Sequence, residues 1–390
     1  MTADDFVAAL AGLEDIDDGA FPVERRLEIA GCALRIRLSS PRLAERALRA
    51  LAHHDARPET RPETRPEAPP EARSEARRNE ARSTPELTIF VGDHDAPANP
   101  LAARAGAPGN PRAADLAAAS DRIERFSYDG RAGRGLLHEG FRALFLRARE
   151  GNRAALWLGE TARFPYHLAT SPLLPILAWF LAGRGRSVVH AGAVVTAAGA
   201  VLLAGRSGTG KSTASLACLA DGLDLLGDDM CVIEQAGAPI VHSLFCSAKI
   251  EVADIGRFPT LLAALAPDVH ADTEKAVFLF DRYGAERIRR SAPIAAIAFP
   301  VRGSDAAPQR ISVKEAFLAM APNTVFQMPG IGRDAAAGVK ALVSAVPAYR
   351  VGVGHSIAEI APRIRAFADL LPPTRDAGAA DRDASRCPTP

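Results

Sequence analysis

The sequence lacks a surplus of either charge, although charged side chains are plentiful. Its 47 Lys and Arg residues nearly balance 46 Asp and Glu residues, which leaves a formal net charge of +1. This balance gives no electrostatic reason to expect a nucleic-acid partner or a membrane-surface partner. The 390 residues are 48% hydrophobic and 24% charged, which is typical of a soluble chain long enough for one large domain or two ordinary ones.

Cysteine pairs and long apolar runs are also missing. The five cysteines are scattered, and no two have the C-x-x-C spacing of a zinc or redox site, so reduced and mostly buried thiols are expected. The most apolar run, PLLPILAWFLA at residues 172–182, is shorter than the roughly 20 residues that span a bilayer. Residues 1–20 are acidic and have no apolar core after a basic start, unlike a signal peptide. We therefore expect a cytoplasmic protein.

Residues 1–55 and 86–185 predict a smaller α+β region. From residue 27, LEIAGCALRIRLS alternates apolar and charged side chains, which predicts a half-exposed strand, and Ser40-Pro41 begins a helix expected to reach residue 54. Other elements expected in this region are strands at 86–92, 123–128 and 154–159, and helices at 141–150 and 173–181.

Two segments have the composition of disordered chain. Residues 56–85 repeat Pro, Glu and Arg with almost no apolar side chains, so they cannot bury enough surface to offset the entropy of ordering. We expect this segment to be a disordered insertion. The polar residues 373–390 are expected to form a frayed tail.

Residues 186–372 predict an α/β domain. Short apolar segments, SVVHAGAVV and AVLLAG, lead into a glycine-rich turn and then an alanine-rich helix, which is the order of a P-loop core. Further strands are expected in KAVFLFDRYG, RIRRSAPIAAIAFPVR and VPAYRVGVG, and helices at 313–320 and 357–371.

The turn itself, GRSGTGKS at residues 205–212, matches G-x-x-x-x-G-K-[ST] in full. Its backbone N–H groups and the start of the following helix are expected to hold a nucleotide phosphate, with the lysine on the β- and γ-phosphates and the serine on Mg²⁺. The loop therefore predicts that the chain binds a nucleoside triphosphate together with Mg²⁺. The predicted nucleotide-binding residues are Gly205, Ser207, Gly208, Thr209, Gly210, Lys211, Ser212 and Thr213.

Two adjacent aspartates follow the helix. LDLLGDDM predicts a neighbouring strand ending in Asp228 and Asp229, beside the phosphates. Adjacent strand residues point to opposite faces, so one carboxylate could serve the metal while the other accepts a proton from a hydroxyl; either could instead cap a turn. Upstream lies His190, and a lone histidine among apolar residues is more often a hydrogen-bonded core residue.

Taken together, residues 188–229 resemble the catalytic domain of HPr kinase/phosphorylase. That family has an H-G or H-A pair before a strand, a G-x-S-G-x-G-K-S loop, and a helix leading through a glycine to an Asp-Asp pair; here these are His190-Ala191, the loop, Gly222 and Asp228-Asp229. The resemblance is weaker across 187–371. It implies a fold related to ATP-dependent phosphoenolpyruvate carboxykinase. It also implies His190 near the phosphates, Lys211 on phosphate, Ser212 on Mg²⁺ and a general base supplied by the aspartate pair. We favour Asp229 as the base and Asp228 as the metal ligand, and the reverse assignment stays open.

The chain departs from the family further along. Where the family has a metal-binding glutamate in an E-I-R-G-x-G-I-like segment, this chain has LFCSAKIEVADIG, in which Glu251 or Asp254 could substitute and Lys249 could take the basic role. Basic candidates for stabilising the transferred phosphate are Lys275, Arg289 and Arg290, with a solvated charge cluster as the alternative. The N-terminal region resembles HPr-kinase-like proteins of peptide-modifying systems, including lasso-peptide tailoring kinases, rather than carbohydrate-signalling kinases.

The expected function is an ATP- and Mg²⁺-dependent kinase acting on a hydroxyl, foremost a serine of a peptide or small protein. Alternatives are a small-molecule kinase, and an ATPase or nucleotide-gated sensor without transfer. The histidine and both aspartates favour transfer, because a binding protein needs only the phosphate loop. No helicase or recombinase motif follows, which disfavours a nucleic-acid motor. The related family forms hexamers, so a homo-oligomer is an open expectation.

Overall fold

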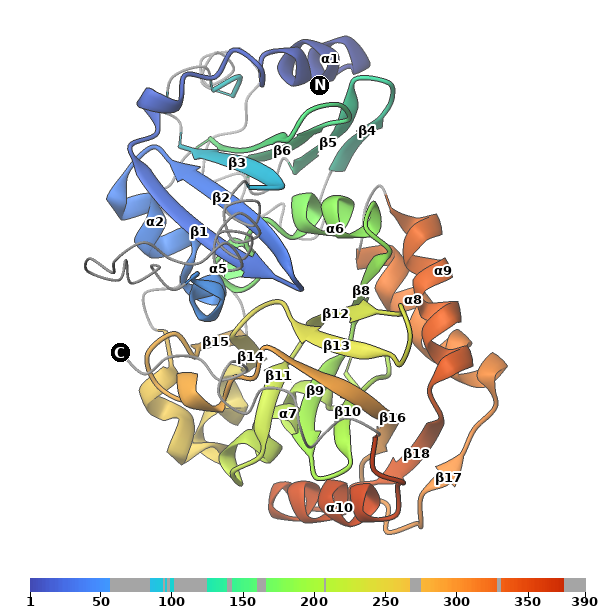
Figure 1. The fold of residues 1–390 in the computed structure, drawn as a ribbon. Coiled ribbons are helices and arrows are strands. Elements are labelled where there is room, and N and C mark those ends of the chain that lie inside the picture. The colour runs from blue at the N-terminus through green and yellow to red at the C-terminus, as the bar shows by residue number, and fades with distance from the viewer. Residues whose placement is uncertain are drawn as a thin grey trace, which may run out of the picture. The chain divides into compact units, whose positions relative to one another are not determined.

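The computed structural model describes residues 1–56, 85–93, 95–96, 99–101, 125–138, 142–159, 166–206, 208–266, 275–327 and 331–374. In these ranges the chain is a mixed α/β protein that forms two compact units (Figure 1). The first unit comprises Met1–Ala44 and His54–Glu160, and the second comprises Glu45–His53 and Thr161–Pro390. The α/β prediction is confirmed at this level. Nearly all of the predicted insertion at 56–85 and of the tail at 373–390 lies outside the described residues.

The first unit is built on a seven-stranded sheet in the order β1-β2-β3-β7-β6-β5-β4. Parallel pairing joins β2 to β3 and β3 to β7, and the remaining neighbours are antiparallel. The strands are β1 Val23–Ile29, β2 Cys32–Leu38, β3 Leu87–Gly92, β4 Arg125–Asp129, β5 Gly133–His138, β6 Ala143–Ala148 and β7 Arg153–Leu158. The helices near them are α1 Ala3–Ala11, η1 Asp18–Ala20 and α2 Pro41–Ala47.

One prediction for the first unit is confirmed in part, and another is wrong. The expected half-exposed strand is β2, in which buried and half-buried residues alternate, but it begins at Cys32 because Ala30 and Gly31 adopt φ of 50° and 75° and turn the chain out of β1. The helix expected at 141–150 is instead strand β6, whose six residues are buried except for the half-buried Arg147. A short apolar run buried on both faces of a sheet has no alternation to distinguish it from a buried helix.

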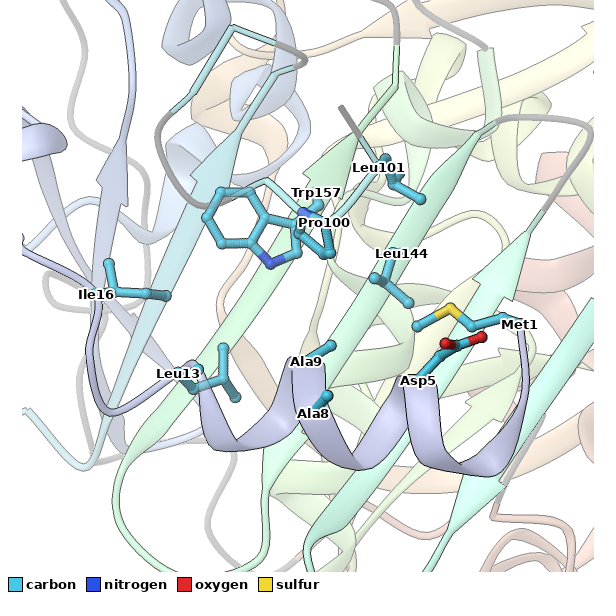
Figure 2. A pocket seen from close by; sticks show the side chains of 11 residues that line it. Met1, Asp5, Ala8, Ala9, Leu13, Ile16, Pro100, Leu101, Leu144 and Trp157 are labelled. Carbon is cyan, nitrogen blue, oxygen red and sulfur yellow. The ribbon is translucent and has the colours of Figure 1, made fainter. Parts of the chain in front are cut away.

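The first unit also holds an apolar pocket of about 410 Å³ (Figure 2). Side chains on α1 face Trp157 and Leu144 of the sheet across it. The lining residues all belong to the first unit: Met1, Asp5, Ala8, Ala9, Gly12, Leu13, Ile16, Pro100, Leu101, Leu144 and Trp157. None of the predicted site residues is among them, so the pocket supplies no nucleotide chemistry.

The second unit contains a nine-stranded sheet whose main path is β11-β9-β10-β16-β13-β12-β8. The additional strand β18 pairs parallel with β16 and antiparallel with β17, while β14 and β15 form a separate hairpin. The strands are β8 Arg186–His190, β9 Gly192–Thr196, β10 Gly199–Leu203, β11 Asp224–Gly227, β12 Met230–Glu234, β13 Ile240–Ser243, β14 Ser247–Glu251, β15 Lys275–Leu279, β16 Ser291–Val301, β17 Gln309–Arg310 and β18 Ala348–Gly352.

Helices cover both faces of this sheet, as the alternation of strand β10 requires. Val201 and Leu203 belong to a core with helices α7 and α10, whereas Ala200 and Leu202 belong to a core with helices α8 and α9. Figure 1 shows α8 and α9 side by side. The helices are η2 Arg49–His54, α5 Tyr166–Thr170, α6 Leu174–Ala182, α7 Lys211–Ala220, η5 Val252–Arg257, η6 Pro259–Ala264, η7 Ala285–Arg287, α8 Val313–Gln327, α9 Gly332–Ala345 and α10 Ile357–Asp369.

The second unit reaches beyond residues 186–372 at its N-terminal side. It includes α5, α6 and most of η2. The predicted helix at 313–320 is the first half of α8, which continues through Pro322. In the described part of the chain, no helix is long and apolar enough to cross a membrane.

Candidate active site

Five strand ends meet at one edge of the second unit's sheet. Strand β8 ends at His190, β9 begins at Gly192, and the register places Leu203 of β10 opposite Gly192 and Gly227 of β11 opposite Ala193. The phosphate loop follows β10, and the two aspartates lie in the bend between β11 and β12. The topology therefore brings His190, the loop and the aspartate pair together.

This arrangement corrects two details of the sequence prediction. Strand β11 is not the direct neighbour of β10, since β9 runs antiparallel between them. The segment SVVHAGAVV is not one strand, since β8 pairs with β12 while β9 pairs with β10 and β11. The break at Ala191 leaves His190 at a strand end, where its side chain can reach the bend that follows β11.

Gly192 allows the aspartate bend to approach helix α7. A Cβ at this position would lie 2.5 Å from Ser215 Oγ and 3.0 Å from the carbonyl oxygen of Asp228. Both distances are shorter than van der Waals contact permits, so any larger residue would push the helix and the bend apart.

The phosphate loop has the backbone that its glycines predict. Gly205, Gly208 and Gly210 have φ of 142°, 79° and 88°, which side-chain-bearing residues rarely adopt. Gly210 is the N-cap of α7 and supplies no side-chain cap, so the first N–H groups of the helix point toward the loop. Thr209 Oγ1 donates to the Arg206 carbonyl at 2.8 Å. Ser207 lies outside the described residues.

Lys211 is buried at the start of α7. Its Nζ donates to the carbonyl oxygens of Gly205 at 3.0 Å and Arg206 at 3.1 Å. Burial lowers the pKa of Lys211, and the carboxylates of Asp229 and Asp228 oppose that shift. The next residues of α7 are Ser212, which lies beside Asp228, and the buried Thr213.

Asp229 is held between two basic side chains. Its Oδ1 lies 2.7 Å from His190 Nε2, and its Oδ2 accepts from Lys249 Nζ at 2.7 Å. Burial alone would raise the pKa of Asp229, but the Lys249 ammonium and then the His190 ring hold it well below its usual range. Because a carboxylate only accepts, Nε2 of His190 carries the proton in this pair. The Asp229 side chain keeps 23% of its surface exposed, so a second molecule can reach it.

Asp228 is in a different environment. It is 1% exposed, and burial followed by the neighbouring Asp229 charge raises its pKa to about 6. Its Oδ2 accepts from the Lys249 backbone N–H at 3.3 Å, while its Oδ1 is buried without a hydrogen-bond partner among the described residues. Since buried carboxylate oxygens are normally paired, this atom is positioned for a ligand that supplies positive charge.

The hairpin β14–β15 carries three further candidate residues: Lys249, Glu251 and Lys275. Lys249 contacts both aspartates, Glu251 forms an ion pair with Lys275, and the two β14 side chains lie on one face of the strand. Burial alone would lower the pKa of Lys249, but Asp229 and Asp228 raise it above its usual value. The lysine is therefore a fixed positive charge beside the aspartate pair.

The remaining candidates have other partners or lie at the opposite end of the sheet. Arg289 Nε lies 3.7 Å from Asp224 Oδ2, and Asp224 begins strand β11 at the end opposite to the aspartate bend. Arg290 immediately precedes β16, whose other end is the one beside the loop. Asp254 pairs with Arg257 at 2.9 Å on η5. Arg289 and Arg290 thus lie at the end of the sheet away from the loop, and Asp254 is engaged by Arg257.

Three residues of this site carry no sequence signal. Asn323 Nδ2 donates to the Gly205 carbonyl at 2.8 Å, and Thr324 Oγ1 accepts from the His190 N–H at 3.2 Å. Burial raises the pKa of Tyr166, which Lys249 opposes and the carboxylates of Asp229 and Glu251 reinforce. Tyr166 belongs to a segment that the sequence assigned to the N-terminal region. All three residues lie outside the motif, and only the fold reveals them.

The donor set fits a magnesium ion that is shared with phosphates. Among the described residues, no cluster of three or more His, Cys, Asp and Glu side chains could hold a metal. Mg²⁺, however, is commonly held by one or two carboxylates, water and substrate phosphate oxygens rather than by an all-protein cage. Asp228, with its unpartnered Oδ1, and the adjacent Ser212 hydroxyl are hard oxygen donors of this kind.

Comparison with known proteins adds little to this description. A scan against protein-family models finds no match, and a search of curated proteins finds no relative. Among solved structures, the Hpr(Ser) kinase/phosphatase from Coxiella burnetii is similar over 47% of this chain and 94% of its own, with 12% identity and a TM-score of 0.28. A likeness of this size carries no argument about function.

Proposed function

We propose that the protein is an ATP- and Mg²⁺-dependent kinase that transfers the γ-phosphate to a hydroxyl group, with a serine of a peptide or small protein as its acceptor. One observation carries the proposal: the phosphate-loop lysine, the aspartate pair and His190 lie together at one sheet edge. Nucleotide binding alone would need only the loop. The serine acceptor is supported by the sequence resemblance to HPr kinase/phosphorylase and to peptide-tailoring kinases.

In the proposed complex, the loop amides, the N-terminus of α7 and Lys211 bind the β- and γ-phosphates. Lys211 then exchanges its carbonyl partners on Gly205 and Arg206 for phosphate oxygens. Ser212 and Asp228 would hold Mg²⁺, which when bound neutralises phosphate charge and fixes the geometry for in-line displacement.

Asp229 is proposed as the proton acceptor. The serine oxygen forms a bond to the γ-phosphorus while the bond from that phosphorus to the β–γ bridging oxygen breaks, and the serine proton passes to Asp229. The His190 and Lys249 contacts orient this carboxylate. The same contacts lower its basicity, so the contribution of Asp229 depends on its position against the hydroxyl more than on a matched pKa.

Transfer can be tested with γ-labelled ATP, Mg²⁺, an array of serine-containing peptides and a matched array in which alanine replaces each serine. We expect label on serine peptides only, and no label with Lys211→Met. Free serine or another small alcohol as the preferred acceptor would instead indicate a small-molecule kinase. ADP release that is equal with and without acceptors would indicate an ATPase, and binding without turnover would indicate a sensor.

The two aspartates can be separated by their asparagine variants. Asp229→Asn is expected to lower transfer by 10²-fold or more, of the order contributed by general-base catalysis, while Mg²⁺–ADP binding persists. Asp228→Asn is expected to remove the Mg²⁺ dependence of nucleotide binding. If the two phenotypes are exchanged, the roles of the aspartates are reversed while the kinase proposal stands.

A further inference from the structure

Arg302 lies directly beside the phosphate loop, although no motif marks it. It follows β16, the parallel neighbour of β10, and β16 continues three residues beyond Ala298, the partner of Leu203. A Cβ at Gly210 would lie 2.9 Å from Arg302 Cδ, 3.6 Å from its Cγ and 3.9 Å from its Nε. The aliphatic stem of Arg302 therefore runs along the N-cap residue of α7.

The guanidinium of Arg302 has no protein partner in the part of the chain that the structure describes, and the residue is exposed. The nearest carboxylate in sequence, Asp305, is already engaged by Arg363 and lies 3.5 Å from His355. An exposed arginine without an ion-pair partner is common on protein surfaces and by itself indicates nothing. Arg302, however, lies directly beside the predicted phosphate loop.

Positive charge gathers around Gly210. Arg302 and the positive end of the α7 dipole meet there, next to Lys211 in the chain, and all three would stabilise an anion bound at the loop. A planar guanidinium suits a phosphate group especially well, because two of its N–H groups can donate to two phosphate oxygens.

The position of Arg302 on the loop indicates which phosphates it can reach. The backbone N–H groups of such a loop and the first N–H groups of its helix hold the α- and β-phosphates. Arg302 lies against Gly210, which is both the last glycine of the loop and the N-cap of α7. Transfer to a hydroxyl deprotonated by Asp229 requires the γ-phosphate to face Asp229, so the phosphates beside Gly210 are the ones that stay on the nucleoside.

We propose that Arg302 binds the non-transferred phosphates of the nucleotide and thereby sets the affinity for ATP and ADP alike. This assignment rests on the kinase function proposed above. It makes Arg302 a binding residue rather than a group that stabilises the transferred phosphate in the transition state. No other described side chain is needed for the contact.

The test is calorimetric titration of the full chain with Mg²⁺–ADP and with Mg²⁺ and a non-hydrolysable ATP analogue. Arg302→Gln is expected to raise Kd about tenfold for both nucleotides by the same factor, of the size expected for losing one charge-assisted hydrogen bond. Arg302→Lys should recover part of the affinity. The control is Arg310→Gln, which changes another exposed arginine on β17 and should leave both Kd values unchanged.

In turnover assays, the KM for ATP should rise by more than kcat falls in Arg302→Gln. Unchanged Kd values in Arg302→Gln would overturn the assignment. So would a loss confined to the ATP analogue, or a fall in kcat larger than the rise in KM, since each places Arg302 on the transferred phosphate. If the wild type binds ADP but transfers nothing, the kinase proposal fails while the Kd comparison still decides the role of Arg302. If the wild type binds neither nucleotide, both proposals fail.

Discussion

The surroundings of the buried Asp228 side chain disfavour its ionised form. Its pKa rises from 3.8 to about 6, chiefly through burial and then through Asp229. The folded protein therefore holds this proton more tightly than the unfolded chain, so stability falls as pH rises between about 4 and 6 and stays lower above that window. At 1.36 kcal/mol for each tenfold change in proton affinity, the ionised carboxylate costs the fold about 3 kcal/mol at neutral pH.

We predict that Asp228→Asn stabilises the nucleotide-free protein by about 1–3 kcal/mol at pH 7.5 while transfer is lost, because the amide is neutral and retains an acceptor for the Lys249 N–H. Urea unfolding between pH 4 and 8 measures it, and the difference from wild type should grow between pH 4 and 6. Asp254→Asn, which changes a surface ion pair, is the control. A difference that is independent of pH would contradict the titration of Asp228 as its source.

Gly192 provides a second test at the scale of one residue. Gly192→Ala places a methyl group 2.5 Å from Ser215 Oγ and 3.0 Å from the Asp228 carbonyl oxygen, so we predict a loss of about 1–3 kcal/mol in unfolding free energy and a fall in transfer rate. Thermal unfolding and the transfer assay measure the two effects. The control is Gly256→Ala, because nothing lies within 4 Å of a Cβ there. Equal stability of the two alanine variants would show that α7 and the bend separate at little cost.

At the scale of elements, helix α8 joins the two halves of the site. Consecutive residues on it contact different parts: Asn323 binds the Gly205 carbonyl, which also accepts from Lys211, and Thr324 accepts from the His190 N–H. The helix packs on the sheet through Ala316 and Met320, so its position is fixed by the core. A helix more than a hundred residues downstream of the loop therefore positions both the loop and the histidine.

We predict that Thr324→Val destabilises the protein by about 1–3 kcal/mol, since it leaves the buried His190 N–H without its acceptor at nearly constant side-chain volume. Transfer should fall as His190 loses its position. Urea unfolding and hydrogen exchange at residue 190 measure this, with Ser344→Ala on α9 as an exposed-hydroxyl control. Unchanged exchange at residue 190 would show that the strand pairing with Met230 alone holds the histidine.

The elements also show what sequence can and cannot predict. The loop is predictable because its glycines dictate a local backbone, and helix α7 follows from the same eight residues. His190 and the aspartates could be selected from the sequence by their chemistry. Their mutual contacts could not be predicted, because these depend on the strand break at Ala191 and on β9 running between β10 and β11.

Other features depend on tertiary contacts with no local signature. Arg289 was a candidate for binding phosphate because of its charge, but it is paired with Asp224. Arg302 lies beside the loop, although no sequence motif marks it. Strand β6 was predicted as a helix because burial on both faces removes its alternation. Asn323 and Tyr166 become visible only when distant segments are brought together.

At the scale of the whole molecule, the second unit incorporates a short segment from far upstream. This segment, residues 45–53, makes three contacts with the rest of the unit. The Cys246 N–H donates to the Ala50 carbonyl, and His53 Nε2 lies 2.7 Å from Ser243 Oγ. Arg49 forms a bidentate ion pair with Asp281. The Asp281 side chain is only 9% exposed, so this ion pair is largely removed from water.

We predict that Arg49→Met lowers the unfolding free energy of the second unit by about 2–4 kcal/mol, because it leaves the Asp281 carboxylate without its guanidinium partner. Hydrogen exchange should quicken first in strands β14 and β15. Arg257→Met, which breaks an exposed ion pair with Asp254, should change stability by less than about 0.5 kcal/mol. Similar effects of the two variants would mean that the upstream segment is held by its backbone contacts alone.

The same segment limits how the two units could be exchanged between genes during evolution. The polypeptide passes between the units three times, after residues 44, 53 and 160. A gene carrying only residues 161–390 would encode a second unit without the segment that binds Cys246, Ser243 and Asp281. Each unit is made of two separate stretches of the chain, so a single recombination event could not transfer either unit intact. A lineage that exchanged one unit would have to replace the contacts of residues 45–53 or inherit both stretches together.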